Sequence, residues 1–101
     1  MEKRRPHYDL EAIKRAIGSE EKLVMSTVAA RSAIDLGFDR ASVAAVIMSI
    51  ERRMFYKSMT TYANSREWQD VYHVRAGSML LYVKFQADII AEFQLISFKE
   101  K

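Results

Sequence analysis

The 101-residue chain has no cysteine, three glycines and one proline. The absence of cysteine excludes disulfide bonds, a thiolate nucleophile and cysteine-ligated zinc. No apolar run approaches the roughly 20 residues that a membrane-spanning helix requires. The basic start, "MEKRRPHYDL", is not followed by the apolar segment of a signal peptide. We therefore expect a cytoplasmic protein with no membrane partner.

Histidine is also scarce, because His7 and His73 are the only two and they lie far apart in the sequence. No set of His, Asp and Glu residues has the spacing of a metal site, and no nucleotide-binding or metalloprotease motif occurs. We therefore expect neither a metal ion nor another cofactor. The 16 Lys and Arg residues exceed the 13 Asp and Glu residues by only three, a slight preference for anionic partners.

Apolar residues, by contrast, are plentiful, and make up half of the chain. A chain of this length buries one modest core, and division into two domains would leave both halves marginally stable. We therefore predict one domain over residues 1–101.

The first half of the chain has helical periodicity. Residues 9–18, 26–37 and 39–50 each place apolar side chains three or four positions apart, which predicts three short amphipathic helices. The sequence also contains the residue types that begin and end helices. The expected N-caps are Asp9, Ser26 or Thr27, and Asp39, and the expected helix ends are Gly18 and Gly37.

From Met54 onward the periodicity changes to two, which is typical of strands. The predicted strands cover residues 54–62, 67–75, 78–90 and 91–99. Their short connections favour antiparallel pairing. The last strand is apolar on both sides, so we expect it to be central or covered. The pattern predicts an α+β fold, a small antiparallel sheet with about three N-terminal helices on one face and the other face open.

The open face of this sheet is the expected place for a ligand, since its side chains are mostly polar. A lysine inside a strand, such as Lys57, marks either a solvated face or a site, because burying an unpaired lysine costs several kcal/mol. The face of Lys57 is ambiguous, because it shares its parity with Phe55 and Met59. The candidate site residues are Lys57, Gln69 and Tyr82, followed by His73, Arg75, Lys84 and Lys99.

Each candidate also has an ordinary structural interpretation. Lys84 and Lys99 fit solvated strand lysines, and His73 fits a partly buried histidine with satisfied hydrogen bonds. Aromatic residues of the strands, of which we expect Trp68 on the core side, are more often core than platforms for nucleobases.

Three irregular segments give the chain a family resemblance. "FYKSMTTY", "WQDVYHVR" and the final "SFKEK" resemble the motility quorum-sensing regulator (MqsR) toxins of bacterial toxin–antitoxin systems, and the opening "MEKRRPH" does too. The resemblance is weakest in "SVAAVIMSIERR". It implies a RelE-like microbial ribonuclease fold, and a messenger RNA interferase that cleaves single-stranded RNA at GCU sites without the ribosome.

The resemblance also implies the site. The family's active-site lysine, glutamine and tyrosine fall on Lys57, Gln69 and Tyr82, with Lys99 as a weaker fourth residue. His73 is a departure, since an arginine stands there in a family member. Chemically, Lys57 supplies positive charge to phosphate, Gln69 orients phosphate or base, and Tyr82 exchanges a proton or holds the phosphate.

The partner implied by the resemblance is an MqsA-like antitoxin with a zinc-binding part and a helix-turn-helix part, so that DNA is reached only through the antitoxin. Two other functions stay open from the residues alone. A basic sheet would equally serve a non-catalytic RNA-binding or ribosome-binding module, or a protein-interaction domain.

Overall fold

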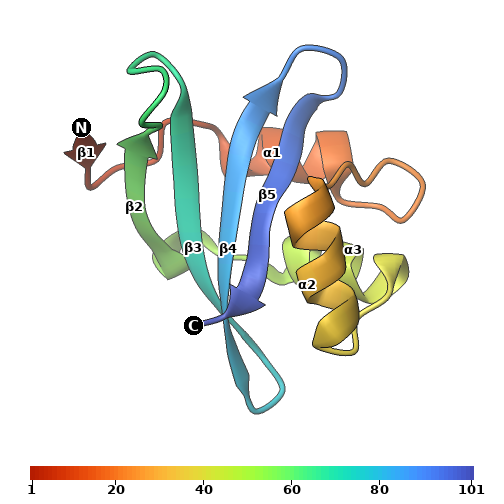
Figure 1. Ribbon diagram of the computed structural model, residues 1–101. Coiled ribbons are helices and arrows are strands. Elements are labelled where there is room, and N and C mark those ends of the chain that lie inside the picture. The colour runs from red at the N-terminus through yellow and green to blue at the C-terminus, as the bar shows by residue number, and fades with distance from the viewer.

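The computed structural model describes residues 1–101 as three helices beside a five-stranded antiparallel sheet (Figure 1). The strands lie across the sheet in chain order, β1-β2-β3-β4-β5. This arrangement confirms the α+β prediction. None of the helices combines the length and apolar character needed to cross a membrane. The elements are β1 (Glu2–Lys3), α1 (Leu10–Ile17), α2 (Thr27–Asp35), α3 (Arg40–Ser49), the 3₁₀ turn η1 (Arg52–Met54), β2 (Phe55–Thr60), β3 (Trp68–Ala76), β4 (Met79–Asp88) and β5 (Glu92–Glu100).

The helices begin at the predicted residues, because a short polar side chain accepts a backbone N–H at each start. Asp9 accepts from Glu11 N at 3.1 Å and caps α1. Ser26 caps α2, and Asp39 caps α3 in a capping box. Gly18 is the C-cap of α1.

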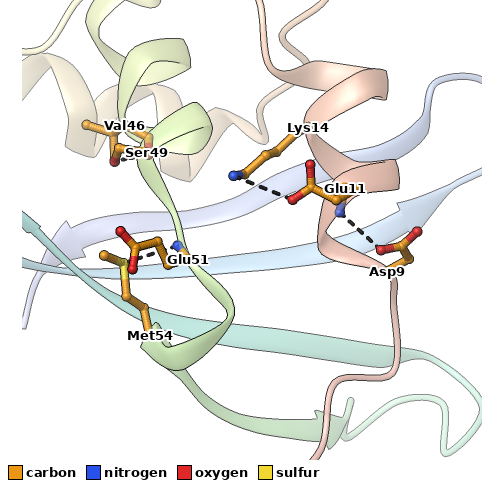
Figure 2. A network of polar contacts seen from close by, with 7 residues as sticks. All are labelled: Asp9, Glu11, Lys14, Val46, Ser49, Glu51 and Met54. Carbon is orange, nitrogen blue, oxygen red and sulfur yellow. Dashed lines mark hydrogen bonds and ion pairs between the residues drawn. The ribbon is translucent and has the colours of Figure 1, made fainter.

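The start of α1 and the end of α3 lie close together above the sheet (Figure 2). At α1, Lys14 Nζ lies 3.7 Å from Glu11 Oε2. Beyond α3, the backbone N–H of Glu51 points to Met54 Sδ at 3.4 Å and helps turn the chain into β2.

One cluster of 18 buried residues fills the space between the helices and one face of the sheet. In β3 and β4 the strand residues in it alternate along the chain, so every second side chain points toward the helices, whereas in β5 an irregularity in the register with β4 separates Leu95 from Phe98 by three positions. The opposite face of the sheet is therefore free of helices. The strand members of the cluster are Tyr72, Val74, Leu81, Val83, Phe85, Phe93, Leu95 and Phe98.

The strands differ from the prediction in several features, one of which is that β2 ends at Thr60 rather than residue 62. The two-residue β1 was missed. β4 ends at Asp88 rather than residue 90, and Ile89 and Ile90 are exposed in the turn before β5. β5 is an edge strand and not central, but the chain before α2 covers its middle, where Leu95 N donates to Val24 O and Ser26 N donates to Leu95 O.

Candidate active site

A β-bulge in β2 resolves the ambiguous face of Lys57. Phe55 pairs with Tyr72 on the helix side, where the two rings lie edge to face at 5.6 Å. The register then shifts, so that Lys57 pairs with Val71 on the open face. The extra residue is Tyr56, which is 41% exposed. The bulge therefore brings a lysine and an aromatic ring to the open face together.

Lys57 forms an ion pair that the sequence analysis did not anticipate. Its Nζ atom lies 3.2 Å from Glu2 Oε2, and the two side chains are 20% and 56% exposed. The contact exists because β1 pairs with β2, with Glu2 opposite Met59. A residue 55 positions away in the sequence thus supplies a carboxylate to the predicted site.

Tyr82 lies in the middle of the open face, opposite His73 of β3 and Lys99 of β5. The Nζ atom of Lys99 is 5.0 Å from the centre of the Tyr82 ring. Burial raises the pKa of Tyr82, although the charge of Lys57 opposes part of this rise. The hydroxyl is therefore protonated at neutral pH and serves as a hydrogen-bond donor.

Lys84 belongs to a row that crosses the sheet from Lys57 through Val71 to Ser97. Val71 is fully buried, although it is not part of the core under the helices. Burial lowers the pKa of Lys84, and the charges of Lys99 and Lys57 lower it further. Lys84 is thus a partly desolvated cation within the field of two others, and the prediction of a merely solvated lysine does not describe it.

Gln69 lies in a neighbouring row of amides. Its Nε2 atom donates to Gln86 Oε1 at 2.7 Å, and Gln86 is paired in turn with Gln94. Gln69 is four residues along β3 from His73, which faces Tyr82, so the two rows are roughly 13 Å apart at 3.3 Å per residue. Gln69 and Tyr82 therefore lie on opposite sides of the Lys57 row and do not meet at one point.

His73 stacks on Tyr56, with ring centres 4.3 Å apart and planes at 24°. Burial lowers the pKa of His73, and the charge of Lys101 adds to this effect. The imidazole is therefore neutral at pH 7. Arg75 is exposed, opposite Leu80 near the end of β3.

Trp68 lies on the expected core side of β3 but outside the core cluster. It is half-buried on the helix side, where its ring stacks on His7 at 5.1 Å and Lys3 Nζ lies 4.2 Å from its centre. The next residue on that face, Asp70, is buried and accepts from Ser58 Oγ at 2.6 Å. Asp70 also accepts the backbone N–H groups of residues 7 and 8, at 3.1 and 2.9 Å. Together these contacts fix the N-terminal segment on the sheet.

The largest cavity, about 640 Å³, does not coincide with the open face. It lies between the start of α1 and the turn before β2, and includes Asp9, Lys14 and Glu51. A hollow of about 280 Å³ lies beside Glu2 and Met59 at the edge of the sheet. We place the candidate site on the open face, because the lysines and Tyr82 converge there.

Two comparisons with known proteins identify what the chain resembles. A family model described as "Motility quorum-sensing regulator, toxin of MqsA" matches residues 5–100. The chain is also 38% identical over 102 residues to the mRNA interferase toxin MqsR of Escherichia coli (strain K12), an alignment that covers all of both chains. The family match includes β2, β3, β4 and β5, which carry Lys57, Tyr82 and Lys84.

Proposed function

The chain belongs to the family of motility quorum-sensing regulator toxins and is an endoribonuclease, and from this premise we propose that it cleaves single-stranded messenger RNA at GCU sites without a metal ion or the ribosome. Cleavage would stop translation and growth, as expected of the toxin in a type II toxin–antitoxin pair.

The observation that carries this proposal is the positive charge around Tyr82. Three lysine side chains place positive charge on the same part of the open face: Lys57, Lys84 and Lys99. Of these, only Lys57 has a carboxylate partner. Lys84 is partly buried beside two other cations and has no carboxylate partner. A bound phosphate would supply the negative charge that this group of cations lacks. A phosphodiester is the group that such a surface favours.

The chemistry follows from the protonation states. Attack of a ribose 2′-oxygen on the neighbouring phosphorus builds negative charge on the phosphate oxygens, and Lys57 stabilises that charge. The protonated hydroxyl of Tyr82 donates to a phosphate oxygen or to the leaving 5′-oxygen. The row of Gln69 lies roughly 13 Å from the row of Tyr82, at 3.3 Å per residue. We therefore assign Gln69 to a neighbouring nucleotide of the same RNA rather than to the scissile phosphate.

Metal independence is supported by the side chains available. Within residues 1–101, no three His, Asp or Glu side chains come together as a metal-binding group. Catalysis is therefore assigned to the protein's own charges and to alignment of the 2′-oxygen with the leaving group.

We also propose an MqsA-like antitoxin as the protein partner, with a zinc-binding part and a helix-turn-helix part that contacts DNA. The description of the matching family as the toxin of MqsA supports this proposal. Co-expression with the neighbouring open reading frame should give a complex that co-purifies, and separate elution of the two proteins would contradict it.

The test of the proposed activity is incubation of the purified protein with a short GCU-containing RNA in EDTA, without ribosomes. We expect cleavage products that carry a 2′,3′-cyclic phosphate and a 5′-hydroxyl, and an RNA in which GCU is changed should stay intact. Loss of cleavage in EDTA and its return with Mg²⁺ would refute metal independence. Binding without cleavage would favour the alternative, a non-catalytic RNA-binding or ribosome-binding module.

A further inference from the structure

The lysine cluster of the open face contacts one carboxylate, that of Glu2. Glu2 Oε2 is 3.2 Å from Lys57 Nζ. Asp70 lies on the opposite face, where it is occupied by Ser58 and by backbone N–H groups. The side chain of Glu67 accepts hydrogen bonds from Gln86 at 3.5 Å and from Thr61, and contacts none of the lysines. Glu2 is thus the acidic group next to the proposed phosphate site.

The position of Glu2 is determined by both of its chain neighbours. On one side, Thr60 N donates to Met1 O at 2.9 Å. On the other side, Lys3 pairs with Ser58 in the sheet, and its Nζ atom lies over the Trp68 ring. The backbone of Glu2 is therefore held against β2, although its side chain is half-exposed and free to contact a ligand.

Glu2 also lines the hollow of about 280 Å³ at the edge of the sheet. Glu2 therefore borders the hollow, and its carboxylate contacts the ammonium group of Lys57. If a nucleotide places its ribose in the hollow and its 3′-phosphate on Lys57, its 2′-hydroxyl lies beside Glu2. The other residues that line the hollow are Met1, Met59, Thr60, Thr61 and Tyr62.

We propose that Glu2 is the general base of the reaction, taking the proton of the 2′-hydroxyl of a ribose that lies between the hollow and Lys57. The inference rests on the proposed function. The O2′–H bond breaks as the proton passes to the Glu2 carboxylate, and the O2′–P bond forms. The P–O5′ bond breaks, and the leaving oxygen takes a proton from water, because Glu2 lies in the row of Gln69 and not in that of Tyr82. The products are a 2′,3′-cyclic phosphate and a 5′-hydroxyl, and the hydroxide left from the water takes the proton from Glu2 and restores its carboxylate.

The reaction needs a general base, a role that Lys57, Gln69 and Tyr82 do not fill and a carboxylate can. An ammonium or phenol group of ordinary pKa must lose a proton before it can accept one at neutral pH, whereas a carboxylate is already ionised. His73 is the competing base, since it is neutral at pH 7. It lies opposite Tyr82, one row from Lys57, and is stacked on Tyr56.

The test compares Glu2→Gln with wild type in single-turnover and steady-state cleavage of a short GCU RNA. Glu2→Gln keeps the size and polarity of the side chain but is not a base. We expect kcat to fall about 100-fold or more, within the range for loss of a general base, while KM changes little. The matched control is Glu21→Gln, which removes the same charge from an exposed turn far from the site along the chain. It should retain wild-type kcat.

A second variant separates proton transfer from a structural effect. Glu2→Ala leaves space for a small carboxylate, so added formate or acetate should restore part of its kcat in proportion to concentration. Glu2→Gln, whose amide fills that space, should not respond. Thermal unfolding should show both variants folded.

Several outcomes would overturn the inference. An unchanged kcat in folded Glu2→Gln would do so, as would an increase in kcat with a lower KM, which would mean that Glu2 only competes with phosphate for Lys57. A 100-fold loss in His73→Asn but not in Glu2→Gln would assign the base to His73. In each case wild type still cleaves and the proposed function stands, whereas an inactive wild-type protein would refute the proposed function itself.

Discussion

Removing the ammonium group of Lys57 should separate catalysis from stability. We choose Lys57→Met, because methionine keeps most of the aliphatic chain that lies beside the buried Val71. In the free protein, the variant loses an ion pair with the 56%-exposed Glu2. Such pairs contribute about 0–1 kcal/mol, so the free energy of unfolding should change by no more than that.

In the proposed transition state the same substitution would remove a cation from the developing phosphorane. Loss of one such stabilising group costs roughly 3–4 kcal/mol, which corresponds to about 100- to 1,000-fold in rate. The assay is single-turnover cleavage of a GCU RNA, measured beside urea unfolding of the same preparation. Lys22→Met, a change in an exposed turn, is the control for net charge. A folded Lys57→Met protein that retains cleavage within threefold of wild type would refute the assignment of Lys57.

Three further substitutions test other parts of the structure. Tyr82→Phe removes only a hydroxyl, so it should reduce cleavage by about 10-fold or more without loss of fold; wild-type cleavage rates would contradict a role for that oxygen. Asp70→Asn should lower the free energy of unfolding by roughly 2–4 kcal/mol in urea, because the buried carboxylate accepts from Ser58 and two backbone N–H groups; a change below 1 kcal/mol would show that the network matters little. Lys84→Met should raise the free energy of unfolding at pH 7, because the lowered pKa of Lys84 means that the unfolded state binds its proton more tightly. That gain should shrink as the pH rises toward the ordinary lysine pKa of 10.5, and a gain that is constant with pH would contradict the desolvation argument.

The parts of the fold that were predicted correctly depend on neighbours in the sequence. Asp9 and Asp39 cap their helices through N–H groups two or three residues away. The alternation along β4 placed Tyr82 and Lys84 on one face, as observed. Such patterns are visible without knowledge of the tertiary structure, because cap and pleat are local geometry.

The parts that were missed depend on contacts between distant residues. β1 is two residues long and exists only because it pairs with Met59 and Ser58, so no local periodicity reports it. Glu2 therefore gave no signal as a site residue. The bulge at Tyr56 is equally hidden. Without it, Phe55 and Lys57 would point to the same face of the sheet, but the extra residue puts them on opposite faces.

Trp68 lies on the expected side of the sheet but outside the core cluster, and β5 is covered, one of the two expected alternatives, without being central. A pattern of apolar residues indicates that a side chain is covered but does not identify what covers it. The N-terminal segment covers Trp68, through His7 and Lys3, and the chain before α2 covers β5. In both places the segment that covers the strand residue is irregular chain, not a helix or a further strand.

The two faces of the sheet are coupled through this N-terminal segment. On the helix side, the buried Asp70 holds the backbone at residues 7 and 8, and Trp68 stacks on His7. The same segment, a few residues earlier, crosses to the edge of β2 and presents Glu2 to Lys57 on the open face. Asp70 on the helix side is satisfied by protein partners and contributes to stability, whereas Lys84 and Lys99 on the open face lack an acidic partner. If Glu2 acts as proposed, loosening the Asp70 network should therefore weaken catalysis through displacement of Glu2, even though Asp70 itself lies on the opposite face of the sheet from the proposed RNA site.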